Sequence, residues 1–544
     1  MRCAGVVGIM LMQSILLHAS VSTHNQVSLS NNYKYHSIHK GQAKGAPKAR
    51  LIYGPYLQLV NGQGATLRWR TNIPTDSKVE VGTAYKQYTA HAGDTALTTE
   101  HEVRISGLEE DTKYYYRFGS STQVLQEGKN NYFTTAPPAH TTRKIRVAVF
   151  GDCGTNDKFN RTFSIASYRQ HTGDNPAELM LLLGDNAYYD GLDREYQQKF
   201  FRPFSRHLLK NHALFPAPGN HEYANNPARQ KDLAIPYYEL FSLPRQGECG
   251  GTPSGSESYY SYNWGNIHFV SLDSYGEHDG GTTRLYDTSG AQVQWLKKDL
   301  EANSLPWTVV YWHHPPYTMG SHNSDKETEL VKIRENFLRV LERYGVDLVL
   351  TGHSHNYERS YLLNGYYSRE QGFEPTNHAV STSSGRWDGG SNSCPYTTGS
   401  GAGQKGTVYV VSGSSGASGH VEEDYPHNAM PFSLNTGGMF YFEVEGTRLD
   451  ARFIRKNGTI GDQFTIVKEV PSLQYLVVRS GDTATLTAGW SGQHRWSTGA
   501  KERSITITPL EDTTLTVQDP KGCLSQTFRI TVKPTGTKVV VPGG

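Results

Sequence analysis

Apolar runs and amphipathic stretches alternate through the middle of the chain. Short runs dominated by apolar side chains occur at 144–150, 178–183, 307–312 and 346–350. Runs of this kind are typical of strands that helices cover on both faces. Two other stretches, 291–302 and 327–344, repeat apolar residues at helical spacing. The pattern therefore predicts a central α/β domain.

Alternating β patterns flank this central domain on both sides. Upstream, residues 51–135 contain short alternating strands separated by Gly, Asn, Pro and Asp turns, which predicts an all-β sandwich. Downstream, three further strand-like runs occur at 407–412, 439–444 and 449–454. A further β pattern between Trp496 and Val532 predicts a small C-terminal β-sandwich. The sequence thus predicts a multidomain protein with an all-β domain, a central α/β domain and a small β-sandwich, in that order.

The first residues have the features of a secretory signal. Arg2 is followed by an apolar stretch from Ala4 to Leu17, interrupted only by Gln13 and Ser14, and then by small residues. The stretch is short for a membrane span, although a retained anchor is the alternative. We therefore expect a secreted, periplasmic or cell-surface protein without a stable membrane span. The expected segments are a signal peptide 1–22, a leader 23–48, an N-terminal β domain 49–137, a central domain 143–468, a C-terminal module 470–535 and a tail 536–544.

Composition agrees with a multidomain protein and excludes a strongly charged partner. The chain has 544 residues, of which 36% are hydrophobic and 19% charged, and its formal net charge is +2. This balance predicts attraction to neither nucleic acid nor membranes. Of the five cysteines, Cys3 would leave with the signal peptide, and Cys153 is expected to be a buried neighbour of the site. Cys249 and Cys394 lie in Gly- and Ser-rich loops and could pair in an oxidising compartment.

Polar motifs stand where the predicted strands of the central domain end. Their side chains are oxygen and nitrogen donors suited to metal ions, and sheets of this class place their ligand sites at the carboxyl ends of strands. Each motif alone is an ordinary turn, because Gly, Asp and Asn are common turn residues. Because all five motifs occur in order at strand ends, together they predict a two-metal site of the kind at which phosphate esters are hydrolysed. The motifs are 151–154 (Gly-Asp-Cys-Gly), 184–188 (Gly-Asp-Asn-Ala-Tyr), 219–222 (Gly-Asn-His-Glu), 310–313 (Val-Tyr-Trp-His) and 352–355 (Gly-His-Ser-His).

On these motifs the chain resembles the purple acid phosphatases of the calcineurin-like metallophosphoesterase superfamily. All five blocks occur in order, and residues 352–360 are especially close to the last block of the family. Gly154 stands where other branches of the superfamily have a histidine, and Tyr188, three residues after Asp185, stands where this family replaces it with a phenolate. No Asp-Arg-Gly sequence follows Asp185, which argues against the Ser/Thr protein phosphatase branch.

The resemblance implies a ligand set and two metals. Asp152, Tyr188 and His355 would bind one metal, Asn220, His313 and His353 the other, and Asp185 would bridge them. A phenolate with carboxylates suits Fe(III), whereas the second set suits Zn(II), Mn(II) or Fe(II). Metal-bound hydroxide would attack the phosphate in line.

Several histidines near the motifs receive separate interpretations. The resemblance assigns His221 as a phosphate donor or general acid, with His322 the next candidate for such a role. His314 is expected not to be a ligand, and His420 is expected to be a loop residue.

The fold, the flanking modules and the function follow from the same resemblance. The central domain would be a sandwich of two mixed sheets flanked by helices, and the runs 407–412, 439–444 and 449–454 would complete its second sheet. The N-terminal domain resembles a fibronectin type III-like domain, and the C-terminal module resembles immunoglobulin-like repeats of bacterial secreted proteins. The function implied is a secreted phosphatase acting on phosphate monoesters of small molecules or peptides, with no nucleic acid required. Two alternatives stay open: a phosphodiesterase with the same centre, and a surface-binding protein with an idle catalytic domain. The C-terminal module could attach the protein to a cell surface, and the loop 381–406 could cover the active site.

Overall fold

The computed structural model describes residues 48–155, 157–281, 283–399 and 405–534. The expected signal peptide, nearly all of the expected leader and the tail lie outside these residues. Within the described part of the chain, no helix is both long enough and apolar enough to cross a membrane.

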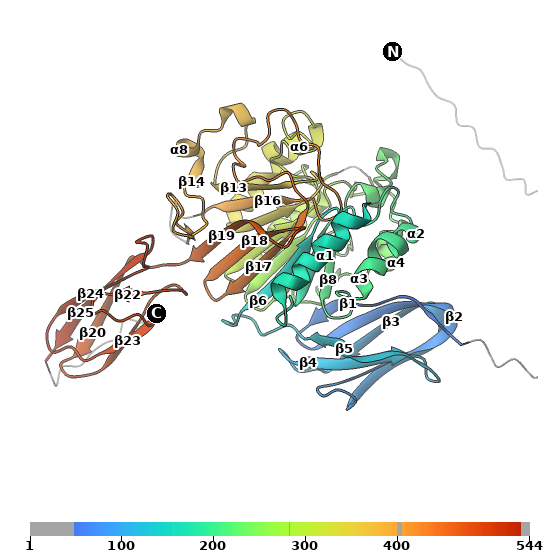
Figure 1. The fold of residues 1–544 in the computed structure, drawn as a ribbon, viewed down its shortest axis with the longest axis horizontal. Coiled ribbons are helices and arrows are strands. Elements are labelled where there is room, and N and C mark those ends of the chain that lie inside the picture. The colour runs from blue at the N-terminus through green and yellow to red at the C-terminus, as the bar shows by residue number, and fades with distance from the viewer. Residues whose placement is uncertain (1–47, 156, 282, 400–404, 535–544) are drawn as a thin grey trace, which may run out of the picture. The chain divides into compact units, whose positions relative to one another are not determined.

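The central domain contains two mixed β-sheets (Figure 1). In the first sheet the strand order is β15-β19-β18-β17-β6-β7-β8-β1-β2-β4-β5, with β3 paired to β2. In the second sheet the order is β14-β13-β16-β12-β11-β10-β9. The central strands of the first sheet are β6 (Ile145–Phe150), β7 (Leu179–Leu183), β8 (Ala213–Ala217), β15 (Tyr396–Thr398), β17 (Gly438–Glu445), β18 (Arg448–Arg455) and β19 (Ile460–Lys468). Those of the second are β9 (Tyr260–Trp264), β10 (Ile267–Ser271), β11 (Trp307–Tyr311), β12 (Leu348–Thr351), β13 (Tyr357–Leu363), β14 (Ala379–Ser381) and β16 (Thr407–Ser412).

The side chains of one apolar strand contribute to two different hydrophobic cores, because they point alternately to its two faces. In β11, Trp307, Val309 and Tyr311 belong to the core between the two sheets, whereas Val310 belongs to the core beneath the helices. Both faces are buried because successive side chains of a strand point to opposite faces. The four apolar runs of the sequence are confirmed as strands, with bounds that differ by one or two residues.

Helices cover the outer faces of the sheets. The two helices expected from apolar spacing are confirmed: α5 spans Ala291–Ala302, and the second begins as α6 (Thr328–Lys332), continues through a π-helical turn (Ile333–Phe337) and ends as α7 (Leu338–Tyr344). On the other side, α1 (Lys158–Thr172) lies along β17 and β18 (Figure 1). The shorter helices are α2 (Asp193–Glu195), a π-helix (Tyr196–Phe201), α3 (Arg202–Ser205), α4 (Pro236–Leu240), α8 (Pro375–His378) and 3-10 turns at His221–Tyr223, Pro227–Arg229 and Glu370–Gly372.

One expectation about the sheets is wrong. Strand β16 does join the second sheet, but β17 and β18 extend the first, because β17 pairs antiparallel with β6, with Phe440 opposite Val149. The runs are apolar on both faces in either position, so their pattern carries no information about which sheet they join.

A buried ion pair connects the two sheets. Arg359 in β13 donates to Asp462 in β19 over 2.6 Å and 3.1 Å, and the Tyr357 hydroxyl donates to the same carboxylate over 3.0 Å. The side chains of Arg359 and Asp462 are almost fully buried. Because an uncompensated buried charge is costly, each member of the pair depends on the other.

The N-terminal β domain continues the first sheet. Its strands are β1 (Leu51–Asn61), β2 (Gly64–Gly82), β3 (Ala90–Ser106), β4 (Lys113–Gly119) and β5 (Val124–Thr134). Short strands were expected, but β2 is 19 residues long and pairs with β1, β3 and β4. Strand β1 meets β8 of the central domain, with Leu57 opposite Ala213. The hydroxyl of Tyr56 donates to Leu240 O over 2.7 Å, so a side-chain hydrogen bond also connects the N-terminal domain with the central domain.

The C-terminal module has its own buried core. Four strands form one sheet in the order β20-β25-β24-β22, and β21 pairs with β23 in a second. Trp490, Trp496 and Phe528 are buried in a cluster that also includes Val467 at the end of β19. The strands are β20 (Leu473–Arg479), β21 (Ala484–Thr487), β22 (Arg495–Trp496), β23 (Ser504–Ile507), β24 (Thr513–Gln518) and β25 (Ser525–Lys533).

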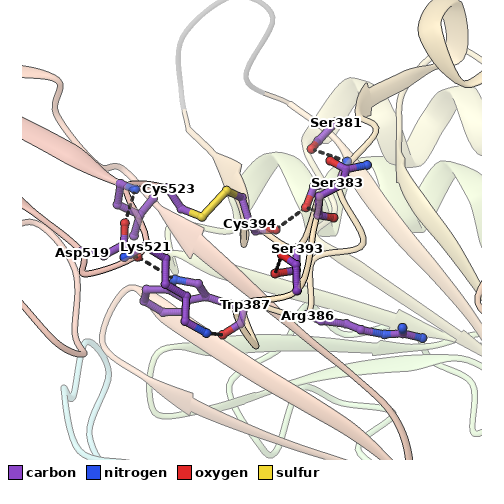
Figure 2. The surroundings of a disulfide bond; sticks show 12 residues. Ser381, Ser383, Arg386, Trp387, Ser393, Cys394, Asp519, Lys521 and Cys523 are labelled. Atoms are coloured by element: carbon purple, nitrogen blue, oxygen red, sulfur yellow. Dashed lines mark hydrogen bonds between the residues drawn. A yellow bond between two sulfur atoms is a disulfide. The ribbon is translucent and has the colours of Figure 1, made fainter.

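A disulfide joins this module to the central domain. Cys394, just before β15, is bonded to Cys523 with a Cα–Cα distance of 5.3 Å (Figure 2). Beside it, Trp387 Nε1 donates to Asp519 Oδ2 over 3.1 Å. The pairing of Cys249 with Cys394 that the sequence left open is wrong: Cys249 is a free thiol buried in the main core next to β9. Cys153 is buried and free, as expected.

Candidate metal centre

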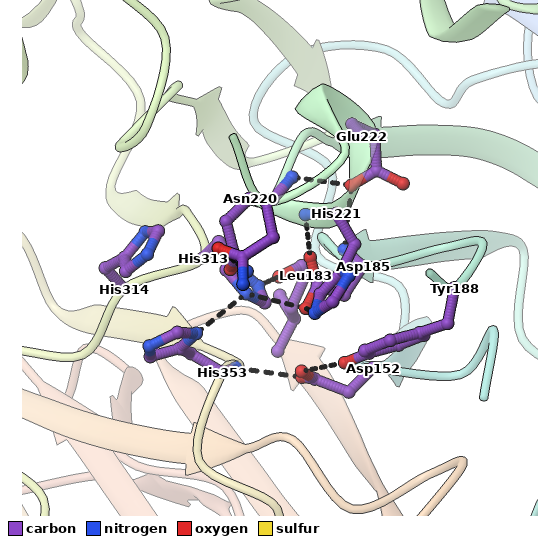
Figure 3. A network of polar contacts seen from close by, with 12 residues as sticks. Asp152, Leu183, Asp185, Tyr188, Asn220, His221, Glu222, His313, His314 and His353 are labelled. Atoms are coloured by element: carbon purple, nitrogen blue, oxygen red, sulfur yellow. Dashed lines mark hydrogen bonds and ion pairs between the residues drawn. The ribbon is translucent and has the colours of Figure 1, made fainter. Parts of the chain in front are cut away.

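The motif residues sit just beyond the ends of strands in both sheets. Asp152, Asp185 and Asn220 follow β6, β7 and β8, which are parallel neighbours. His313 and His353 follow β11 and β12, which are parallel neighbours in the second sheet. The carboxyl ends of both sheets therefore deliver their side chains to one place, which Figure 3 shows from close by.

The backbone of these turns is unusual and needs the glycines before it. Asp152, Asp185 and His353 have φ angles of 52°, 53° and 67°, in the left-handed region that most residues avoid. At Gly184, which has a φ of +87°, an added Cβ would lie 2.6 Å from the ring of His313. The glycine thus permits both the turn and the close approach of the two ligand-bearing loops.

Asp152, Tyr188 and His355 form one cluster. The Tyr188 hydroxyl donates to Asp152 Oδ1 over 2.9 Å and lies 3.1 Å from His355 Nε2. His355 Nε2 in turn lies 3.4 Å from Asp152 Oδ1. The three donor atoms lie close enough to share one ion.

Asp185, His313 and His353 form the second cluster. His313 Nε2 lies 3.2 Å from Asp185 Oδ2 and 3.2 Å from His353 Nδ1. The other ring nitrogen of His313 lies 2.7 Å from Leu183 O, which fixes the tautomer and leaves Nε2 as a lone-pair donor. Donor atoms of these three buried residues all lie within 4.8 Å of one another, a spacing that could hold a metal ion.

Asn220 and Asp185 connect the two clusters to the loop after β8. Asn220 Nδ2 donates to Asn225 Oδ1 over 3.2 Å, whereas Asn220 Oδ1 is buried without a hydrogen-bond partner among the described residues. A buried oxygen of this kind is costly unless a cation or a donor meets it. The backbone of His221 donates to Asp185 Oδ1 over 2.9 Å, which leaves Oδ2 facing His313. The orphaned amide oxygen and the mixed donor set both fit bound metal ions.

The electrostatics of the centre also fit cations. Burial, reinforced by the Asp152 and Asp185 carboxylates, holds the pKa of Tyr188 well above its usual range. A phenolate ligand at this position would therefore need a strongly charged ion beside it. Burial by itself would raise the pKa of Asp185, but His313 and His221 outweigh it and hold that pKa well below its usual value.

Glu222 holds the two central ligand loops together. Its carboxylate is buried and accepts backbone N–H bonds from Gly219 over 2.7 Å, Asp185 over 2.9 Å and Asn186 over 2.9 Å. The Tyr196 hydroxyl donates to it over 2.9 Å. Sequence reasoning included Glu222 in a motif but gave it no role. The feature of the sequence that could have indicated a role is the position of Glu222 directly after Asn220 and His221 in that motif.

His221 and His322, the two predicted catalytic histidines, both line the pocket above the ligands. His221 Nδ1 lies 2.7 Å from Tyr189 O, so this nitrogen carries the proton, and Nε2 lies 3.9 Å from Asp185 Oδ2. His322 Nδ1 lies 3.0 Å from Glu327 Oε2, and its ring stacks on His353 with centroids 3.6 Å apart. The two histidines therefore come from different loops to one pocket.

His314 packs against His353 and lines the pocket but belongs to neither ligand cluster. His314 Nδ1 lies 2.8 Å from Ser274 Oγ, and the ring stands to one side of the clusters in Figure 3. The loop that could cover the active site is described only at 381–399 and 405–406. These residues do not line the pocket, and Trp387 and Cys394 instead contact the C-terminal module. His420 does not line the pocket either.

The pocket above the centre has a volume of about 380 Å³. Several of its lining residues come from segments without any recognised motif, so the sequence gave no signal for them. These residues are Asn225, Pro227, Gln230, Tyr275, Arg284, Glu327, Glu329 and Leu330.

Fold and site together define a metallophosphoesterase-type α/β domain. Residues 145–357 match the calcineurin-like phosphoesterase family, and residues 53–135 match the N-terminal domain of purple acid phosphatases. The chain thus carries a purple acid phosphatase N-terminal domain followed by a calcineurin-like metallophosphoesterase domain.

Known proteins with these domains resemble the chain over part of their length. It is 32% identical over 290 residues to purple acid phosphatase 15 of Arabidopsis thaliana, covering 49% of this chain and 50% of that protein. It is 26% identical over 373 residues to probable purple acid phosphatase 20 of the same plant, covering 65% and 78%. The match thus spans about half the length of the first relative. The structure of purple acid phosphatase PPD1 from yellow lupin superposes with a TM-score of 0.58 at 18% identity, covering 77% of this chain and 74% of that one, which shows a shared fold.

Proposed function

We propose that this chain is an exported acid phosphatase that hydrolyses phosphate monoesters at a binuclear metal centre. One observation carries the proposal: seven donor side chains from the ends of strands in two sheets converge beneath one pocket, around Asp185. The phosphatase relatives and the two matched domains support the same activity. A degenerate site would not be expected to keep so many buried polar groups.

Asp152, Tyr188 and His355 would hold one ion, Asn220, His313 and His353 the other, and Asp185 both. Two cations held by these residues would supply charge neutralisation for the phosphate and a lowered pKa for water, which suits hydrolysis in acid. The phenol and carboxylates of the first set favour Fe(III), and the neutral donors of the second favour Zn(II), Mn(II) or Fe(II).

The residues of the chain supply positioning and protons. Glu222 fixes the loops that carry Asp185 and Asn220, so the geometry exists before substrate arrives. His221 presents Nε2 toward the pocket because Nδ1 is engaged by Tyr189 O. A protonated Nε2 can give its proton to the oxygen of the leaving alcohol. His322, oriented by Glu327, offers a donor to the phosphoryl oxygens.

Export is supported by the disulfide between Cys394 and Cys523, because such bonds persist in oxidising compartments. The secretory signal expected from the sequence would account for it. We assign the C-terminal module, with its resemblance to immunoglobulin-like repeats, to spacing or surface attachment.

The test combines metal analysis with hydrolysis of p-nitrophenyl phosphate and of the corresponding diester. The expected result is two metals per chain, one of them iron, and faster hydrolysis of the monoester. Asp185→Asn should lose both metals, whereas Asp190→Asn, an exposed aspartate in the same loop, should behave as the wild type. Faster diester hydrolysis would make the protein a phosphodiesterase. Two bound metals with no hydrolysis of either ester would favour the surface-binding alternative.

His221→Ala tests the proton donor separately. The variant should keep both metals and lose roughly 10²- to 10⁴-fold in turnover on an alkyl phosphate, but less on an aryl phosphate that needs little protonation. Loss of a metal would instead place His221 among the ligands.

A further inference from the structure

Part of the pocket is lined by residues that have no role in the metal clusters. We name this part the Arg284 wall and define it as Gln230, Tyr275, Arg284 and Glu329. A chain of rings connects it with the ligands: His353 lies 4.3 Å from His314, and His314 stacks on Tyr275 at 5.8 Å. A leaving group that extends from a phosphate at the metals therefore comes within reach of this wall.

Arg284 is held in one position by three neighbours. Its guanidinium donates to Gln230 Oε1 over 2.6 Å, to Glu277 Oε1 over 2.8 Å and 3.3 Å, and to Glu329 Oε2 over 3.1 Å. About four-fifths of the side-chain surface of Arg284, Glu277 and Glu329 is buried. These bonds use four of the five N–H donors of the guanidinium, and Tyr286 is a further side-chain hydrogen-bond partner, so Arg284 itself is fully engaged.

The charge of this group is already compensated. Two carboxylates, from Glu277 and Glu329, face a single guanidinium, which gives a net charge of −1 when both are ionised. Burial raises the pKa of Glu329, so in acid the group approaches neutrality. In neither state does Arg284 present an excess positive charge to a substrate.

An unpaired acceptor adjoins the guanidinium. Glu329 Oε1 is buried and has no hydrogen-bond partner among the described residues, whereas Oε2 of the same carboxylate accepts from Arg284. A hydroxyl of a ligand could donate to this oxygen. A second phosphate, or an ionised carboxylate, carries a negative charge, and it would be repelled by a carboxylate that is already short of donors.

We propose that the Arg284 wall selects phosphate monoesters whose leaving group carries neutral hydroxyls, as in phosphates of sugars and polyols, and disfavours a second anionic group. This inference rests on the proposed phosphatase function and names the substrate class for it. The pocket volume of about 380 Å³ lies within the range of pockets that hold one small organic molecule.

Binding of unreactive analogues tests the inference without turnover. Titration calorimetry on the metal-loaded protein compares 3-hydroxypropylphosphonate with propane-1,3-bisphosphonate, which differ only in the distal group. We expect the hydroxyl compound to bind about tenfold more tightly or better, which corresponds to 1.4 kcal/mol. The preference should weaken as salt rises, because screening reduces repulsion.

Two variants and a control test whether the preference for the hydroxyl compound over the bisphosphonate arises at the Arg284 wall. Glu329→Gln removes a negative charge while keeping an acceptor for Arg284, and should reduce the preference several-fold. Glu277→Gln is the second variant, because it removes charge from the other side of the guanidinium. Glu335→Gln, an exposed carboxylate on the same helical segment as Glu329, removes the same charge outside the pocket and should leave the preference unchanged.

Hydrolysis separates failure of the inference from failure of the proposed function. The ratio of kcat/KM for fructose 6-phosphate to that for fructose 1,6-bisphosphate should exceed one and fall in Glu329→Gln. Equal or tighter binding of the bisphosphonate, in a protein that hydrolyses p-nitrophenyl phosphate, would overturn the substrate class only. A metal-loaded protein that hydrolyses no ester would overturn the phosphatase function itself.

Discussion

Replacing Glu222 by Gln should disconnect the two loops on which the metal centre depends. The carboxylate accepts four hydrogen bonds, two at each oxygen: Gly219 and Asp185 at Oε2, and Asn186 and Tyr196 at Oε1. A carboxamide keeps one oxygen and turns an NH₂ group toward the other pair of donors. The variant thus loses two bonds to a charged acceptor.

The magnitude follows from those two bonds. Burial and the Asp185 carboxylate raise the pKa of Glu222 to about 7, so its carboxylate is charged above that pH. Hydrogen bonds to charged groups contribute about 1.5–3 kcal/mol each, so at such pH the free energy of unfolding should fall by about 3–6 kcal/mol. That is a large part of the total for a typical domain. Because Asp185 is predicted to be shared by both ions, the variant should also bind both metals more weakly. Tyr196→Phe is the matched variant, since it removes one donor and leaves the three backbone bonds, and it should cost about 1–3 kcal/mol.

Calorimetric unfolding and metal analysis after dialysis would measure both effects. The order expected is wild type, then Tyr196→Phe, then Glu222→Gln, for Tm and for metal content. A Glu222→Gln protein with unchanged Tm and two retained metals would refute the reasoning. Loss of only one metal would contradict the shared position of Asp185.

Three further outcomes are expected. Tyr188→Phe should abolish the visible charge-transfer band of an iron-loaded protein, and a surviving band would remove Tyr188 from the ligands. Asp462→Asn should leave Arg359 uncompensated, which should reduce the free energy of unfolding by about 3–5 kcal/mol and so lower Tm. Burial raises the pKa of Asp462, but Arg359 outweighs it and holds the pKa below its usual value. The stabilisation is therefore complete above the usual carboxyl pKa of about 4 and lost as pH falls through the lower folded value, so the Tm difference should shrink in acid. Deleting the residues after Lys468, with Cys394→Ser to avoid a free thiol, should change kcat/KM only a few-fold, because no lining residue of the pocket lies there.

The position of the candidate site could be predicted because chemistry restricts it. Metal-binding residue types at the ends of apolar runs are uncommon by chance, and the structure brings all seven predicted ligands and both histidines to one place. Their roles as ligands and catalysts stay predictions. The Arg284 wall could not be predicted, because Gln230, Tyr275 and Glu329 come from separate segments that share no spacing.

Contacts between residues far apart in the sequence could not be predicted, namely which strands pair and which cysteines are bonded. The runs 439–444 and 449–454 were recognised as strands, but the choice between two apolar sheets depends on which edge is free. The partner of Cys394 depends in the same way on how a module 129 residues further along is placed. Local periodicity carries no information on either choice.

The disulfide gives the C-terminal module two independent attachments to the rest of the chain. One is the peptide connection after β19, and the other is the bond between Cys394 and Cys523. A protease that cuts the connection would leave both fragments in one covalent molecule. The module would separate on a gel only after reduction, so shedding it from an oxidising environment requires two distinct chemical events.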